Sequence, residues 1–381
     1  MLKDYSNFLH DVPLFINYYM QQKKNGIELL LEINEKNSRE FIKQEEAKII
    51  YRRMYGTEFA VLKCMDGRLL FTDLTKTPLG IIQPYRNLGG IFHLGWPFFQ
   101  QAIEGWKKYA ESKDRDSVVF VTYHFSKGDK HRGCKGHEYD DDKARNSSLE
   151  LKKEFDYVYG PASLQSRNKL FAIQVGIETD WESLILHGEN GESIDLAEVF
   201  DSSEDNVKKI LLSLYPSIYS VAPNVIRDFV PLVKGNILHT QEIKKSNRPV
   251  QEASHREWIV AVGRGFDWLH EPNQALIVGP WQDNLSDPIK TAISLVKKNK
   301  EEGLLEGKKI VLLTSGIYRE TQWEEPRLAE LKSRYLKDIA MGVIQKDFKE
   351  LLPDLEVLMT TVDLNTRKIN VIDFSQPEKS T

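Results

Sequence analysis

The chain of 381 residues carries a net charge of −4 at pH 7, has a pI of about 6.2 and is 41% hydrophobic. This composition excludes a fully disordered chain, and its acidic balance argues against nucleic acid or an anionic membrane as the main partner. Its apolar runs are too short for a membrane helix, and the start, with Asp4 and Asp11, does not have the pattern of a signal peptide. We expect a cytoplasmic protein with two lobes or one large α/β unit.

The first half of the chain alternates predicted helices and strands. Residues 26–54 are rich in helix formers, and we assign residues 1–50 to a short helical N-terminal segment. Strands are predicted at 57–64 and at 117–124, where a continuous apolar run is typical of a strand buried on both faces of a parallel sheet. Residues 75–97 contain many turn-forming residues, which predicts an irregular stretch. The other predicted elements are helices over 98–112, 148–160 and 196–233 and strands over 170–180 and 182–188.

The second half begins after a polar stretch, residues 240–255, which we interpret as a linker. Beyond it the alternation resumes, with predicted strands over 256–263, 274–280, 308–316, 355–363 and 368–374 and helices over 287–303 and 325–352. Alternation on both sides of the linker predicts α/β architecture with a largely parallel sheet and flanking helices. We therefore expect one domain over residues 51–245 and a second over 246–381.

The two halves also echo each other. The segments TEFAVLKCMDGRL and REWIVAVGRGFDWL both run from a strand into a turn of glycine, arginine and aspartate, and DSVVFVTYHFSKGD matches GKKIVLLTSGIYRE in pattern. In the second copy Gly263 and Ser315 stand where the first copy has Cys64 and His124. We interpret this as a duplicated fold whose second half has lost its soft metal ligands.

The chain has two cysteines, Cys64 and Cys134, and both are flanked by glycine and charged residues. Thiolate and neutral imidazole are ligands that zinc prefers, and His124 ends the strand that precedes Cys134. Three such ligands would leave the fourth position of a tetrahedral zinc for water, as catalytic sites do. The alternative is that the cysteines are inert core residues and the histidine has a structural role. Since active sites of parallel sheets gather at strand ends, we expect these residues to meet.

The motif CMDGR places Asp66 and Arg68 directly after Cys64. A carboxylate held by an arginine stays ionised and fixed in position. Beside a metal-bound water, such a pair can accept a hydrogen bond and orient the nucleophile. The alternative is an ordinary Asp-Gly turn with an ion pair at the surface.

Taken together, Cys-x-Asp-x-Arg, a strand-ending histidine about 60 residues later and a following cysteine resemble the β-class carbonic anhydrases. The segments RNLGG, YHFSKGDKHRGCKGHEYDDD, VGIETDWESLILH and IVAVGRGFDWLHEPNQALIV make the chain most similar to a divergent branch, the carboxysome shell carbonic anhydrases, over roughly residues 45–375. This resemblance implies reversible hydration of CO₂ to bicarbonate and a proton, with Zn²⁺ held by Cys64, His124 and Cys134 and with Asp66 and Arg68 as the catalytic pair. It also implies a metal-free second domain that mimics the other half of a β-class dimer.

Several alternatives stay open within this interpretation. His131 has the His-x-x-Cys spacing of the β class and is the alternative third ligand. Lesser candidates around the site are the side chains of His93 and His137 and the backbone amides of Gly89 and Gly133. The competing functions are a thiol enzyme, with Cys64 or Cys134 as nucleophile and a histidine base, and a non-catalytic zinc-binding scaffold.

The resemblance also bears on partners and location. CO₂ and bicarbonate are the expected ligands, and pairing of two copies into a homodimer through their catalytic halves stays open. The carboxysomal family carries a longer N-terminal region that serves encapsulation, whereas only residues 1–50 precede the catalytic zinc domain here. We therefore expect a free cytoplasmic protein, with association with a carboxysome shell or with Rubisco as the alternative.

Overall fold

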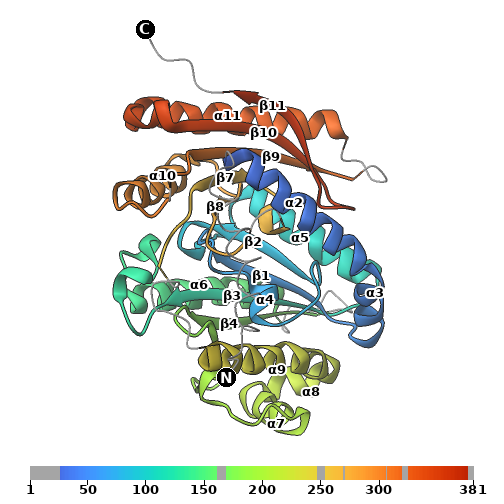
Figure 1. The fold of residues 1–381 in the computed structure, drawn as a ribbon. Coiled ribbons are helices and arrows are strands. Elements are labelled where there is room, and N and C mark those ends of the chain that lie inside the picture. The colour runs from blue at the N-terminus through green and yellow to red at the C-terminus, as the bar shows by residue number, and fades with distance from the viewer. Residues whose placement is uncertain are drawn as a thin grey trace, which may run out of the picture.

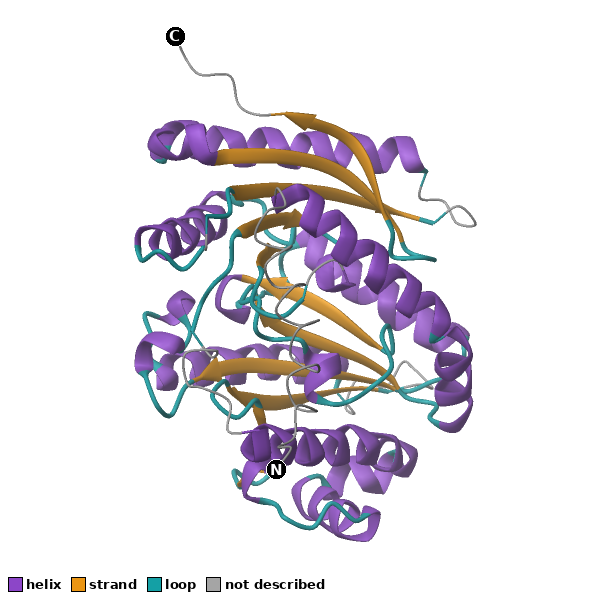
Figure 2. Cartoon of the chain, viewed as in Figure 1, coloured by secondary structure: helices purple, strands orange, loops and turns teal. Residues whose placement is uncertain are grey.

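The computed structural model describes residues 26–160, 169–246, 254–268, 271–305, 307–319 and 325–375. These residues form a mixed α/β protein in which two largely parallel sheets are flanked by helices (Figures 1 and 2). The predicted fold class is therefore confirmed. In the part of the chain that is described, no helix has the length and hydrophobicity needed to cross a membrane.

The first sheet has the strand order β2-β1-β3-β4-β5-β6. Its first four strands are parallel, and the last two are antiparallel to their neighbours. The strands are β1 (Glu58–Cys64), β2 (Ile82–Asn87), β3 (Ser117–Phe125), β4 (Leu170–Glu178), β5 (Ser183–His187) and β6 (Ser193–Asp195). Every residue of β1 and β4 is buried, as expected for central strands covered on both faces.

Strand β2 corrects the prediction of an irregular stretch over residues 75–97. Proline and glycine obscured the strand pattern, because Pro84 lies inside β2 and Gly89 and Gly90 follow it directly. The proline is tolerated because β2 is the edge strand of its sheet, where a backbone N–H is not needed on the outer side.

Helices cover both faces of the first sheet. On one face, Phe99 of α5 and Phe155 of α6 belong to the same aromatic cluster, with ring centroids 6.4 Å apart. On the other face, Phe229 of α9 packs against Phe120 of β3, with ring centroids 5.1 Å apart. The helices of this half are α4 (Phe71–Leu74), α5 (Pro97–Ser112), α6 (Asp141–Tyr159), α7 (Glu204–Leu214), α8 (Pro216–Val221) and α9 (Pro223–Ser246), with short 3₁₀ turns η1 (Leu88–Gly90), η2 (Lys130–Arg132), η3 (Lys135–His137) and η4 (Leu196–Glu198).

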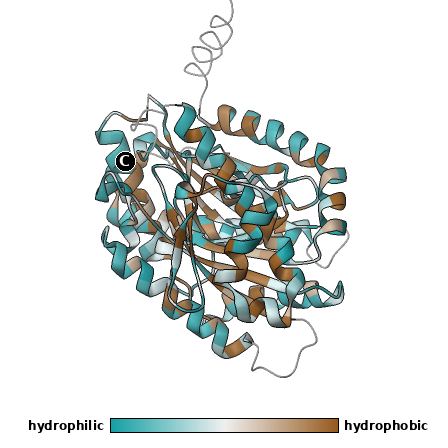
Figure 3. Ribbon diagram, turned by 90° about the horizontal axis from the view of Figure 1, so that it is seen from below, coloured by the Kyte–Doolittle hydropathy of each residue, from teal (hydrophilic) through white to brown (hydrophobic). Residues whose placement is uncertain are grey.

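The second sheet repeats the order of the first, in line with the echo in the sequence. Its order β8-β7-β9-β10-β11, with only β11 antiparallel, matches β2-β1-β3-β4-β5 strand for strand. Its elements are β7 (Ile259–Gly263), η6 (Phe266–Trp268), β8 (Ala275–Val278), α10 (Ser286–Glu301), β9 (Ile310–Tyr318), α11 (Pro326–Asp347), η7 (Lys349–Asp354), β10 (Leu355–Asp363) and β11 (Ile369–Ser375). In Figure 3 hydrophobic residues gather on the strands, while hydrophilic residues cover much of the outer helices.

The two sheets meet through their edge strands, which lie next to each other in the middle of the molecule (Figure 1). Backbone N–H groups of Ile277 and Gly279 donate to the carbonyls of Met65 (2.9 Å) and Arg86 (3.1 Å). Apolar side chains of both halves belong to one continuous core. The carboxyl end of β1 therefore lies against the second half of the chain, and this contact shapes the site described below.

The N-terminal segment is helical as expected, in α2 (Gly26–Lys43) and α3 (Glu45–Met54), while residues 1–25 lie outside the described residues. Helix α2 contacts the second half: the Asn34 amide donates to the Arg367 carbonyl at 2.9 Å and accepts from the Ile369 amide at 2.9 Å. Helix α9 continues to Ser246, so the first part of the predicted linker over 240–255 is helical. The domain boundaries at residues 50 and 245 stay a prediction.

Candidate metal centre

Two parallel strands and one loop bring Cys64, His124 and Cys134 together. Cys64 is the last residue of β1, His124 lies one residue before the end of β3, and Cys134 follows the turn η2. All three side chains are buried, and their ligand atoms lie within 4.8 Å of one another. The two sulfur atoms are 3.9 Å apart. Two thiolates on one tetrahedral zinc, with Zn–S bonds of about 2.3 Å, would be separated by about 3.8 Å.

The loop that delivers Cys134 is held by one carboxylate, Asp180, just beyond the end of β4. Asp180 accepts hydrogen bonds from the Ser126 hydroxyl (2.9 Å) and the Gly128 amide (2.8 Å), and it pairs with Arg132 at 3.0 Å. The nine residues between His124 and Cys134 therefore form an anchored turn that folds back over the strand ends.

The chemistry of the three donors fits a zinc ion. Both ring nitrogens of His124 are buried and, within the described part of the chain, neither has a hydrogen-bond partner. A buried polar atom without a partner is unfavourable, and a metal ion would satisfy it. The hydrogen bond with Cys134 lowers the pKa of the Cys64 thiol, and His124 lowers it further, although burial acts in the opposite direction. A lowered thiol pKa favours the thiolate, which is the form that binds metal.

Asp66 and Arg68 form a buried ion pair beside this cluster. Asp66 Oδ1 accepts from the Arg68 backbone N–H (2.9 Å) and from Nε (3.0 Å), and Oδ2 accepts from Nη2 at 2.5 Å. Burial by itself would raise the pKa of Asp66, but the charge of Arg68, together with His255 and His124, holds this pKa well below its usual range. The carboxylate is therefore ionised at neutral pH, and its Oδ2 lies 3.9 Å from His124 Nδ1.

The second half of the chain completes the site with His255 and Glu257, which the sequence analysis missed. His255 Nε2 lies 3.0 Å from Arg68 Nη2, and His255 Nδ1 lies 3.0 Å from a carboxylate oxygen of the buried Glu257. Because Arg68 can only donate, Nε2 must be the acceptor, and Nδ1–H then donates to Glu257. The only sequence signal was His-x-Glu, with His255 at the end of the stretch interpreted as linker and Glu257 at the start of the strand predicted over 256–263.

Asp66, His255 and Glu257 form a second group whose ligand atoms lie within 4.8 Å of one another. The Arg68 guanidinium contacts both Asp66 and His255, so a cation among these three groups would be repelled. The cluster of Cys64, His124 and Cys134 is therefore the better candidate for a metal centre.

A cavity of about 10 Å³ opens beside the cluster. This is about the space that one water molecule needs. Its polar members include Asp66, His124 and His255, and its apolar wall comes from both halves: Met65, Leu88, Leu276 and Leu295.

The other sequence candidates lie outside the cluster. His131, the alternative ligand, has a 75% exposed side chain and lies near Asp129 at 3.3 Å. His137 is buried, and its Nε2 lies 2.9 Å from the carbonyl oxygen of Gly89, a structural contact. His93 is exposed and lies 3.5 Å from Glu154. Gly133 lines the small cavity, whereas Gly89 contacts His137.

The equivalent position in the second half has different chemistry. Gly263, the last residue of β7, is paired in register with Ser315 of β9, and the Ser315 hydroxyl donates to the Arg264 carbonyl at 2.6 Å. Among the described residues, both groups with metal-ligand geometry lie around the end of β1.

Comparison with known proteins identifies a protein that is distantly similar to this chain. No family model matches the chain. A carboxysome shell carbonic anhydrase from Hydrogenovibrio crunogenus is 20% identical to it over 257 residues, which cover 59% of this chain and 48% of that protein. The chain thus spans about half the length of the relative that it matches. The similarity indicates a distant relationship to a carboxysome shell carbonic anhydrase.

Proposed function

We propose that this protein is a zinc-dependent carbonic anhydrase that catalyses the reversible hydration of CO₂ to bicarbonate and a proton. The observation that carries the proposal is the close approach of Cys64, His124 and Cys134 beside an ionised aspartate held by arginine. The distant similarity to a carboxysome shell carbonic anhydrase supports the same reaction.

In this proposal Cys64, His124 and Cys134 hold Zn²⁺ and leave its fourth position open. When bound, zinc lowers the pKa of water to near 7 and so supplies a nucleophile at neutral pH. His131 is not used, because its side chain is 75% exposed, whereas both thiols are buried, and it does not belong to the group of ligand atoms that lie within 4.8 Å of one another. Burial of all three ligands keeps bulk water from competing for them.

Asp66 and Arg68 orient the nucleophile. An ionised carboxylate can only accept hydrogen bonds, so Asp66 selects a nucleophile that presents its hydrogen to Oδ2 and its lone pair to the substrate. Arg68 fixes the carboxylate through two side-chain hydrogen bonds and keeps it ionised. The pair therefore acts through preorganised electrostatics.

The small cavity favours CO₂ by its polarity. Leu88, Leu276 and Leu295 give it an apolar wall, which favours an uncharged linear molecule over a hydrated anion. Of the two glycines considered from the sequence for steadying bicarbonate, Gly133 lines this cavity and Gly89 does not, but the Gly133 amide already donates to the Lys130 carbonyl at 2.8 Å.

His255 is the group that passes the proton to buffer. Its side chain is 14% exposed, against 3% for Asp66 and 2% for His124, so it reaches closest to solvent among the site's acid–base groups. Glu257 fixes the ring so that the lone pair of Nε2 faces Arg68 and the site. Proton transfer to and from a positioned imidazole is effective near neutral pH.

Zinc content and CO₂ hydration measured on one preparation test the proposal. We expect about one zinc per chain and a hydration rate well above the uncatalysed rate, both abolished by a chelator and restored by zinc. A zinc-free protein inactivated by alkylation would instead indicate the thiol enzyme. A zinc-loaded protein that does not hydrate CO₂ would indicate the scaffold.

Cytoplasmic location, homodimer formation and association with a carboxysome or Rubisco are separate proposals. The carboxysomal alternative is supported by the name of the distant relative. Fractionation of cells that make both the chain and carboxysomes tests it, because a free enzyme would stay in the supernatant when the carboxysomes sediment.

A further inference from the structure

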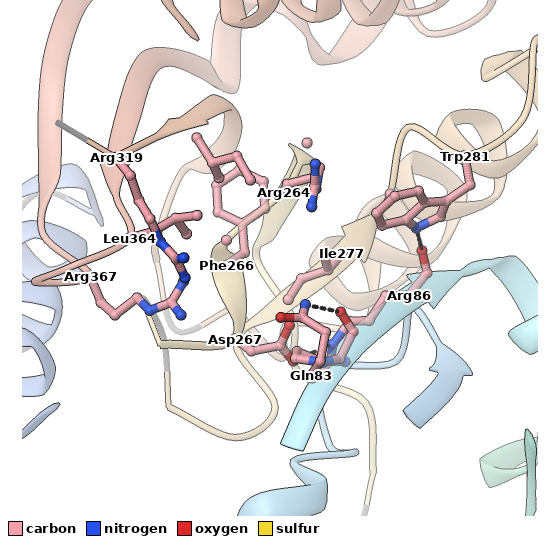
Figure 4. Close-up of a pocket in the computed structure, with 15 residues that line it drawn as sticks. Gln83, Arg86, Arg264, Phe266, Asp267, Ile277, Trp281, Arg319, Leu364 and Arg367 are labelled. Atoms are coloured by element: carbon pink, nitrogen blue, oxygen red, sulfur yellow. Dashed lines mark hydrogen bonds and ion pairs between the residues drawn. The ribbon is translucent and has the colours of Figure 1, made fainter. Parts of the chain in front are cut away.

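A second cavity, of about 50 Å³, lies at the carboxyl end of β7 (Figure 4). It occupies the position in the second half that the metal centre occupies in the first, since Gly263 ends β7 as Cys64 ends β1. Each of the two sites also contains residues from the other half of the chain. His255 reaches the metal centre from the second half, while Gln83 and Arg86 of β2 line the second cavity.

The lining of this cavity is strongly cationic. Its charged members are four arginines, Arg86, Arg264, Arg319 and Arg367, and one carboxylate, Asp267. Asp267 already serves two cations, because Oδ1 accepts from Arg86 Nε at 2.7 Å and pairs with Lys63 Nζ at 3.0 Å. The lining residues of this cavity therefore include more arginines than carboxylates.

Three of these arginines come from separate segments and line the same cavity. Arg264 follows β7, Arg319 follows β9, and Arg367 lies in the turn between β10 and β11. Figure 4 shows the side chains of Arg319 and Arg367 running toward each other at one side of the cavity, with Arg264 across from them. Burial and the charges of Arg319 and Arg264 lower the pKa of Arg367 to about 9, the result expected when like charges are crowded together.

Aromatic rings help to hold two of the guanidinium groups in place. The Arg264 guanidinium carbon lies 5.3 Å from the centroid of the Trp281 ring, and that of Arg367 lies 5.1 Å from the Phe41 ring. Stacking of this kind limits the conformations of arginine, so less entropy is lost when an anion binds.

The size of the cavity limits the ligand. One water needs roughly 10–15 Å³ of such space, so 50 Å³ accommodates about three to five heavy atoms. Bicarbonate and phosphate are of this size, whereas a nucleotide is not. Guanidinium groups also match the oxygen geometry of carboxylate-like and phosphate anions better than that of a spherical halide.

We propose that the cavity at the end of β7 binds a small oxyanion through Arg264, Arg319 and Arg367. Inorganic phosphate and bicarbonate are the two sources of this chemistry. The proposal goes beyond the catalytic function and does not depend on it, because none of these three arginines lines the cavity beside the thiols.

Isothermal titration of the full chain with inorganic phosphate, and separately with bicarbonate, tests the proposal at constant ionic strength set with chloride. We expect saturable binding of at least one oxyanion, and the tighter of the two identifies the source. Arg264→Gln and Arg319→Gln should each weaken that binding by about 10- to 100-fold, the effect of losing one charge-assisted hydrogen bond. Arg334→Gln, which removes an exposed arginine of α11 outside the cavity, is the matched control and should bind as the wild type does.

Two results would overturn the proposal. One is that neither oxyanion binds the wild-type chain. The other is that the Arg264 and Arg319 variants bind as tightly as the wild type, which would place the anion elsewhere, for example at the metal centre. Urea unfolding of each variant checks that it is folded. Both substituted side chains are only partly buried, so if one variant does not fold, the other carries the test.

Discussion

Replacing Asp66 by asparagine tests the role of the orienting carboxylate while leaving the proposed metal ligands unchanged. The substitution keeps the shape of the side chain but removes its charge. Asp66 Oδ1 accepts from the backbone and Nε of Arg68, and Oδ2 accepts from Nη2. In Asp66→Asn one carboxylate oxygen is replaced by an amide NH₂ group. This N–H donor then faces an N–H donor of Arg68, and no hydrogen bond can form between them.

The expected size of the effect follows from burial. The Arg68 side chain is 8% exposed, so the variant leaves a buried guanidinium without its counter-charge. Removing one partner of a buried ion pair destabilises a protein by about 3–5 kcal/mol, and the retained amide oxygen places Asp66→Asn near the lower end of that range. The nucleophile also loses its ionised acceptor, and loss of one preorganised group lowers turnover by about 100- to 1,000-fold.

Asp228→Asn is the matched control for stability. Asp228 is fully buried, accepts from the Thr57 amide and hydroxyl at 2.8 Å each, and pairs with Arg227 at 2.7 Å. This variant should lose unfolding free energy but hydrate CO₂ at the wild-type rate at a temperature where it is folded.

Stopped-flow CO₂ hydration, zinc analysis and urea unfolding of both variants give the answer. We expect Asp66→Asn to keep about one zinc per chain while losing activity. Activity within threefold of the wild type would refute the role of Asp66, and joint loss of zinc and activity would make Asp66 a ligand or a structural support.

Three further predictions concern individual histidines and the second thiol. Cys134→Ser should lose zinc and CO₂ hydration together, whereas His131→Gln should keep both; zinc loss in the histidine variant would restore His131 as the ligand. His255→Gln should keep zinc but turn over at least about tenfold more slowly in weak buffer, with recovery on adding imidazole; no recovery would contradict its role in proton transfer. Burial lowers the pKa of His187 to about 4, so the unfolded chain binds a proton near pH 6.5 that the folded chain does not. The unfolding free energy should therefore fall by about 2 kcal/mol more in the wild type than in His187→Gln between pH 6.5 and 4, and equal slopes in urea unfolding would contradict this.

Much of the fold was predictable because its signals are local. A β pattern predicted β1, a continuous apolar run predicted β3, and the echo between the halves predicted a duplicated fold, which the two sheets of matching strand order confirm. Strand β2 was missed because Pro84 breaks the pattern, and only its place at the sheet edge makes that proline acceptable. Edge position depends on the whole topology and is not written in a short segment.

Part of the candidate site could likewise be predicted from local sequence signals, and part could not. Cys64 and His124 end parallel strands, so their proximity followed from the rule that such strands end at one edge of the sheet. His255 and Glu257 lie about 190 residues away from Cys64 along the chain, and they reach the site only because the edge strands β2 and β8 join the two halves. The placement of Arg264, Arg319 and Arg367 around one cavity depends on the same long-range packing. No spacing in the sequence contains that information.

X-ray absorption spectroscopy of the zinc-loaded protein tests the proposed zinc site of Cys64, His124 and Cys134, because it counts the ligands and measures their distances. We expect two sulfur ligands at about 2.3 Å and two nitrogen or oxygen ligands at about 2.0–2.1 Å, one from His124 and one from an exchangeable solvent position. In Cys134→Ser this spectrum should disappear with the metal. A zinc ion without two sulfur ligands, or with all four positions filled by protein groups, would rule out the proposed catalytic zinc site.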